Sequence, residues 1–184
     1  MKGGGWGLGT GGWRLGAGGR ALIGIVSVTT LGFSASSRAQ APADGWRTFS
    51  GTWSATGTRQ TLPTDHDVAA VARVSGAIVL STDGGVGVGF SADAMGFDDG
   101  AGTVIGRAVW TDSRGDRLFS SLRGEPLQTG RRINGTITGG TGRWAGATGD
   151  YTLTWQFVVA GEGDTIQGRS TDLRGRVRMA EGSR

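Results

Sequence analysis

The sequence contains no cysteine, one histidine and three prolines in 184 residues. Without cysteine there are no disulfides, thiol nucleophiles or cysteine-ligated metal sites, so stability must come from a hydrophobic core and strand pairing. The single histidine, His66, lies between Asp65 and Asp67 in a predicted turn. It is interpreted as a solvated loop residue, with an acid–base role beside either carboxylate as the alternative. Neither a metal nor a cofactor is expected.

The sequence also lacks an apolar run of the ~20 residues that a membrane-spanning helix needs. A shorter run, Ala21 to Phe33, follows a basic start and precedes Ala39-Gln-Ala41, which fits an A-x-A cleavage site. Residues 1–41 are therefore predicted to be a cleavable export signal. Residues 42–184 are predicted to form a single domain, secreted or periplasmic, with no membrane partner once the signal is removed.

An excess of one charge is missing from this predicted mature part. Residues 1–41 hold four of the nineteen basic residues and none of the fifteen acidic residues, which leaves 15 Arg against 15 Asp and Glu. A nucleic-acid-binding domain needs a basic patch, and interspersed charges with a net value near zero do not supply one. No nucleic-acid partner is therefore expected.

What the sequence does have is alternation of polar and apolar residues between turn signals rich in Gly, Asp and Pro. A period of two places successive side chains on opposite faces of a strand, and short links favour antiparallel neighbours. Eight strands are expected: Trp46 to Gln60, Val68 to Ser81, Val86 to Ala94, Thr103 to Thr111, Arg117 to Gly124, Arg131 to Gly139, Asp150 to Ala160 and Thr165 to Met179. They predict an all-β fold, a single eight-stranded antiparallel up-and-down β-barrel without free edges.

Two details of these strands carry further predictions. In the last strand the apolar face shifts between Ser170 and Leu173, which indicates a β-bulge. An outer-membrane barrel needs a uniformly apolar lipid face, whereas Arg73, Arg107 and Arg123 lie on mixed faces of the expected strands. This distribution argues against a membrane barrel.

Glycine is abundant, with 38 residues, and is concentrated between Gly135 and Phe157. Gly140-Thr-Gly-Arg-Trp-Ala145 fits a dinucleotide-binding fingerprint, but that motif needs a helix directly afterwards and the sequence returns to a period of two. The segment Ile137 to Gly149 resembles the signature G-G-T/S-G-x-Φ-x-G-x-x-G, with Φ an aromatic residue, of the allene oxide cyclase and dirigent superfamily. The resemblance implies an eight-stranded barrel, often trimeric, with an apolar cavity and glycines that shape the wall. It also implies a cyclase or isomerase.

A second resemblance keeps a calycin-like barrel open as the alternative. Gly51-Thr-Trp53 matches the Gly-x-Trp at the start of lipocalin and avidin-like barrels, where an Arg of a late strand covers the Trp. Arg174, Arg176 and Arg178 are available for this cation–π contact. This resemblance favours a barrel that binds a small hydrophobic ligand without catalysis.

Aromatic side chains are the candidate ligand-binding residues. If their strand faces point inward, five of them line an aromatic pocket: Trp53, Trp110, Tyr151, Trp155 and Phe157. The alternative is that they fill the core, since an eight-stranded barrel holds either packed side chains or one small ligand. The sequence does not decide which face points inward.

Three other residues are the candidate catalytic set. Glu125 stands at a predicted strand end, and with Arg107 and Tyr151 it would supply an acid–base and oxyanion set for a cyclisation or isomerisation. The alternative for Glu125 is a cross-strand ion pair. The acids Asp93, Asp98 and Asp99 miss the spacing of a calcium loop and are expected to form turns.

The sequence therefore predicts an exported barrel and leaves three functions open. The first is a cofactor-free cyclase or isomerase acting on a small apolar substrate in the cavity. The second is a non-catalytic binder of a small hydrophobic ligand, and the third is a structural barrel with a filled interior. A homo-oligomer, dimer or trimer, is open in each case, and fold alone does not choose among them.

Overall fold

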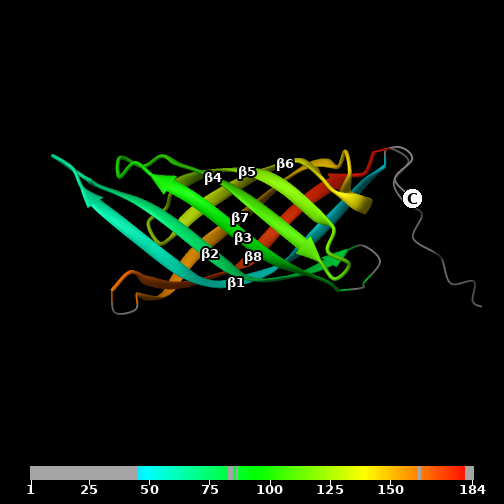
Figure 1. Cartoon of the computed structure of the whole chain (residues 1–184), viewed down its shortest axis with the longest axis horizontal. Coiled ribbons are helices and arrows are strands. Elements are labelled where there is room, and N and C mark those ends of the chain that lie inside the picture. The colour runs from blue at the N-terminus through cyan, green and yellow to red at the C-terminus, as the bar shows by residue number, and fades with distance from the viewer. Residues whose placement is uncertain (1–44, 83–84, 86, 161–162, 181–184) are drawn as a thin grey trace, which may run out of the picture. The chain divides into compact units, whose positions relative to one another are not determined.

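A computed structural model describes residues 45–82, 85, 87–160 and 163–180, and the predicted export signal lies outside them. In this part of the chain eight strands form one closed antiparallel barrel (Figure 1). The strands are β1 (Trp46–Pro63), β2 (Val68–Thr82), β3 (Val88–Asp98), β4 (Val104–Asp112), β5 (Arg117–Pro126), β6 (Arg131–Gly140), β7 (Thr148–Ala160) and β8 (Thr165–Arg178). Each pairs with its sequence neighbours and β1 pairs with β8. The predicted up-and-down barrel is confirmed.

The predicted strand positions agree closely with the observed ones, and the largest difference is at the end of β3. The prediction stopped at Ala94, whereas β3 continues to Asp98. Met95 and Phe97 lie on the outer face and are exposed, at 54% and 45% of their surface. Apolar residues on the solvent face break the apolar and polar alternation, so the pattern no longer marks a strand there.

The burial pattern shows which face of each strand points into the barrel. In β7, Tyr151, Leu153 and Trp155 are buried, while the alternate residues Thr152 and Thr154 are only half-buried. Trp53 of β1 and Trp110 of β4 are buried on the same interior side. The aromatic side chains therefore face inward, which the sequence had left open.

Aromatic rings fill one half of the barrel interior. Trp110 packs against Phe49, Phe90 and Tyr151, with ring centroids 6.2, 5.9 and 4.7 Å away. Phe90 in turn packs against Trp144, which belongs to the link between β6 and β7. We call this filled half, toward the β4–β5 and β6–β7 links, the closed half.

Glycines on neighbouring strands make room for the large rings of β7. A Cβ atom at Gly135, the register partner of Tyr151 on β6, would collide with the Tyr151 ring. At Gly168 on β8 it would collide with the Trp155 ring in the same way. Glycine in a strand allows this close approach, so here glycine and aromatic residue are one packing unit.

The predicted bulge in β8 is present. Leu173 pairs with Gly51 and Ser170 pairs with Trp53, so two residues of β8 oppose one residue of β1 between these pairs. At the bulge the Asp172 carboxylate accepts hydrogen bonds from the backbone N–H and the hydroxyl of Thr154, both at 2.7 Å. The carboxylate thus accepts the Thr154 N–H at a place where the regular backbone pairing between β7 and β8 is interrupted.

Candidate functional site

The barrel holds a cavity of about 120 Å³. It lies away from the closed half, toward the end of the barrel where β3 ends and β4 and β6 begin, since Asp98, Val104 and Arg131 all line it. We call this the open half. The cavity volume is close to the ~150 Å³ of a cavity that holds a benzene ring. The cavity is therefore of a size for about one small ring.

The cavity exists because large side chains face small ones across the barrel. Trp53, Trp155 and Phe157 form one wall, from β1 and β7. The other wall, from β2, β3 and β4, consists mainly of Ala70, Ala72, Ala94, Gly96 and Gly106. Alanine and glycine do not reach across the interior, so the space between the walls stays unfilled.

An ion pair crosses between two non-adjacent strands at this cavity. Arg131, at the start of β6, donates a hydrogen bond to the Asp98 carboxylate at the end of β3. The backbone N–H of Gly100 also donates to this carboxylate, at 3.1 Å. Two donors, from Arg131 and Gly100, therefore hold the Asp98 carboxylate in place on the cavity wall.

Two hydrogen-bond donors of lining residues have no partner among the described residues. They are Nε1 of Trp53 and Nη1 of Arg131, and both are buried. A buried donor without an acceptor costs about 1–3 kcal/mol. The cavity wall thus carries unused donors beside a largely apolar space.

The structure places the five predicted ligand-binding aromatics in two groups. Trp53, Trp155 and Phe157 line the cavity, with Phe157 at its rim because 49% of its surface is exposed. Trp110 and Tyr151 instead belong to the aromatic packing of the closed half. Three of the five aromatics therefore line the cavity and two fill the core, and a ligand-binding role for the first group stays a prediction.

The three predicted catalytic residues do not share a site. Tyr151 points into the closed half, where its hydroxyl is 2.8 Å from Ser120 Oγ. Arg107 and Glu125 are exposed on the outer face of the barrel, and Arg107 hydrogen-bonds the adjacent Gly106 carbonyl. The alternation along β4 and β5 separates them from Tyr151, because their neighbours Ala108 and Gly124 are the residues that face inward.

Burial controls the chemistry of Tyr151. Removal of the hydroxyl from water raises its pKa to about 12, against the smaller opposing effect of the hydrogen bond with Ser120. The phenol is therefore neutral at physiological pH. It is a packing group with a satisfied hydroxyl in this structure.

The predicted cation–π cover of Trp53 is wrong. Arg176 and Arg178 stack on Trp46 instead, with the guanidinium carbon 4.7 and 5.2 Å from the ring centroid. Trp53 packs inside the barrel against Trp155, at 4.9 Å between ring centroids. Arg176 and Arg178, like Arg174, lie exposed on the outward positions of β8 and do not reach the interior.

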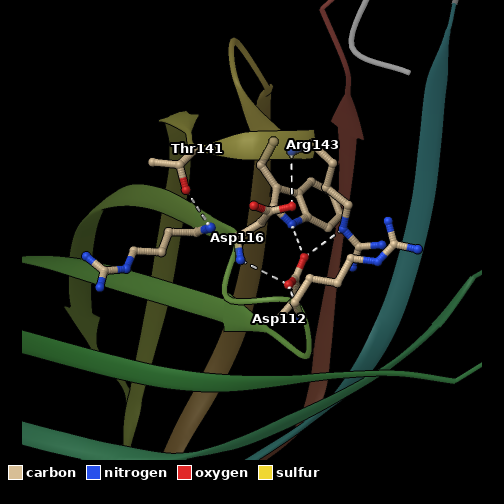
Figure 2. Close-up of polar contacts among 7 residues, drawn as sticks. Asp112, Asp116, Thr141 and Arg143 are labelled. Atoms are coloured by element: carbon tan, nitrogen blue, oxygen red, sulfur yellow. Dashed lines mark hydrogen bonds and ion pairs between the residues drawn. The ribbon is translucent and has the colours of Figure 1, made fainter.

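A polar cluster that the sequence did not predict lies at the other end of the barrel (Figure 2). The Asp112 carboxylate accepts hydrogen bonds from Arg143 Nε at 2.6 Å and Trp144 Nε1 at 2.8 Å. It also accepts from the backbone N–H groups of Arg114 and Asp116, at 2.8 and 3.1 Å. We call this group the Asp112 clamp.

The Asp112 clamp is a structural feature, because each group in it is already paired. Asp116 accepts from the Arg143 backbone N–H, and Thr141 Oγ1 accepts from the Arg117 N–H (Figure 2). Burial raises the pKa of Asp112, but the hydrogen bonds from Trp144, Arg114 and Arg143 outweigh it and lower the pKa overall. The clamp fixes the 3₁₀ helix η1 (Gly142–Trp144), and β7 follows it directly, so the dinucleotide interpretation is excluded.

The remaining candidates, apart from Asp93, lie in loops. Asp98 and Asp99 accept backbone N–H groups two residues ahead, which confirms their interpretation as turn residues. The same interpretation is wrong for Asp93, which lies in the middle of β3 and accepts a hydrogen bond from the Ser75 hydroxyl. His66 is exposed in the link between β1 and β2. Within the described ranges, no group of His, Cys, Asp and Glu could hold a metal ion, and no helix has the length and hydropathy to cross a membrane.

Fold and cavity together define a class of protein, a closed eight-stranded up-and-down barrel with an apolar cavity in one half. Comparison with protein-family models and with curated proteins finds no match to the chain. The resemblance to the allene oxide cyclase and dirigent superfamily therefore stays a prediction.

Proposed function

We propose that this protein binds a small, mainly apolar molecule inside the open half of its barrel. The observation that carries the proposal is the cavity of about 120 Å³ between the aromatic and the small-residue walls. Charged groups on its lining are confined to Arg59, Asp98 and Arg131 among the described residues. An apolar pocket with a few convergent polar groups is typical of small-molecule sites.

A second candidate, a cyclase or isomerase of the allene oxide cyclase type, is favoured by one observation. The Asp98 carboxylate lies on the cavity wall, where a general base would be needed. Enclosure in the barrel would limit the conformations of a flexible substrate. Asp98 already accepts hydrogen bonds from Arg131 and Gly100, so binding without turnover is the function that the geometry supports better.

The test is native mass spectrometry of the protein purified from its own host, followed by titration with a panel of small aromatic and aliphatic molecules. Wild type is expected to carry or bind one molecule per chain. Ala94→Leu adds a large side chain at the small-residue wall and should abolish binding. Ala77→Leu makes the same change on the exposed face of β2 and should leave binding intact.

Two results would contradict the proposal. One is a wild-type protein that carries no molecule and binds none of the panel. The other is equal binding by Ala94→Leu and wild type, since a ligand that tolerates a filled cavity binds elsewhere. Conversion of a bound molecule to an isomer, lost on Asp98→Asn, would favour the enzyme over the binder.

A further inference from the structure

The charges and unused donors on the cavity wall indicate which small molecule fits it. We infer that the cavity takes a single-ring carboxylate, with the ring between the two walls and the carboxylate held by Arg59, Arg131 and Trp53. The inference rests on the proposed binding function and specifies its ligand class.

The first step is the charge on the wall. Arg131 is paired with Asp98, whereas Arg59 has no ion-pair partner among the described residues. The backbone N–H of Arg59 donates to the Asp164 carbonyl at 2.7 Å, which fixes its position on β1. Among the described residues the lining therefore has one positive charge in excess, and an anion is the ligand that compensates it.

The second step is the surplus of donors. Nε1 of Trp53 and Nη1 of Arg131 have no acceptor within the described chain, and the Arg59 guanidinium adds further N–H groups. Asp98, the only carboxylate that the described residues place on the wall, already accepts from Arg131 and Gly100. A ligand must then bring acceptors, and a carboxylate brings two oxygens that match a guanidinium.

The third step is that two of the donor residues, Trp53 and Arg131, belong to one connected part of the wall. Arg131 and Trp155 are register partners on β6 and β7, and the Trp155 ring packs against the Trp53 ring at 4.9 Å. Arg59 lies further along β1 than Trp53, toward the mouth of the barrel. Because the two unpaired nitrogens are buried, a ligand reaches them only by a shift of these side chains, which an indole N–H signal would register.

The last step is size and shape. A volume of about 120 Å³ suits one aromatic ring and excludes a long acyl chain from the interior. The rings of Trp53, Trp155 and Phe157 give it an aromatic wall for stacking. Benzoate is the simplest probe with these properties.

The experiment is an NMR titration of the ¹⁵N-labelled full chain with benzoate, its uncharged analogue benzamide, and toluene. Benzoate is expected to bind about tenfold or more tightly than benzamide and to shift one indole N–H signal, which is absent in Trp53→Phe. Arg59→Gln should reduce benzoate affinity about tenfold and leave benzamide affinity unchanged. Arg73→Gln, on the exposed face of β2, is the matched control and should have no effect.

The outcomes separate this inference from the proposed function. Binding of benzamide or toluene as tightly as benzoate, or no effect of Arg59→Gln, overturns the inference that the ligand is a carboxylate. The proposed binding of a small apolar molecule would still stand. Benzoate binding that persists in Ala94→Leu shows a site outside the cavity and overturns the inference as well. Absence of binding by all three probes overturns it too, and the native mass spectra then decide whether any cavity ligand exists.

Discussion

The Asp112 carboxylate accepts four hydrogen bonds in a buried position, two of them from Arg143 and Trp144 of a distant segment. Asp112→Asn replaces one carboxylate oxygen, which accepts hydrogen bonds, with an NH₂ group. The N–H groups of this amide would then point at other N–H donors. We expect a loss of about 2–3 kcal/mol in the free energy of unfolding, measured by urea denaturation. Asp150→Asn, in the exposed pair with Arg176, is the control and should cost at most about 1 kcal/mol.

The lowered pKa of Asp112 sets how this difference depends on pH. A carboxylate with a lowered folded-state pKa contributes stability that is fully present above its unfolded value, near 3.8, and is lost as the pH falls through the folded value. Wild type and Asp112→Asn should therefore differ at pH 7, and the difference should shrink as the pH is lowered below 3.8. A constant difference over this range would show that the charge of Asp112 does not contribute.

Tyr151 offers a direct spectroscopic test, because it is the only tyrosine in the sequence. Burial raises its pKa to about 12, so its ultraviolet absorbance should change near pH 12 in the folded protein and near pH 10 in urea. The sign follows from linkage. The contribution of Tyr151 to the free energy of unfolding is fully present below the unfolded pKa of 10.0 and decreases as the pH rises toward 12. If the absorbance of the folded protein changed near pH 10 instead, the phenol would be exposed to water and the prediction would be wrong.

At the scale of elements, the glycine and aromatic pairs decide whether neighbouring strands fit. Gly135→Ala puts a methyl group into the Tyr151 ring, and we expect a loss of about 1–3 kcal/mol or more from overpacking. Gly89→Ala is the control, because a Cβ atom at this position of β3 meets no atom within 4 Å. Thermal unfolding of both variants checks the prediction, which fails if the two lose the same stability.

The same scale shows what the sequence could predict. Alternation locates all eight strands and the bulge at Ser170 to Leu173, because both are local patterns within one strand. The Asp112 clamp joins residues 31 positions apart, so no local pattern reveals it. The inward face was also undetermined locally, and with it the division of the aromatics into Trp53 and Trp155 at the cavity and Trp110 and Tyr151 in the core. Whether an aromatic residue lines the cavity or fills the core depends on the side chains that face it from the opposite strands of the barrel.

At the scale of the whole molecule, we propose that the chain is exported and processed. Mass spectrometry of protein from host fractions should find the mature N-terminus close to residue 42, in the periplasm or medium. Ala39→Leu with Ala41→Leu removes the small residues that a signal peptidase needs and should leave the leader uncut. An intact N-terminus confined to the cytoplasm of the wild-type host would contradict the proposal.

We propose that the two halves of the barrel separate stability from ligand binding, since aromatic packing and the Asp112 clamp fill one half and the cavity occupies the other. Tyr151→Phe leaves the buried Ser120 hydroxyl without its partner and should cost about 1–2 kcal/mol without changing benzoate affinity. Ala94→Leu should abolish binding while the barrel stays folded, because the added side chain enters existing space. Paired unfolding and NMR titrations of both variants test this separation. It fails if Tyr151→Phe weakens binding as much as it weakens folding, because the two halves would then respond as one packed unit.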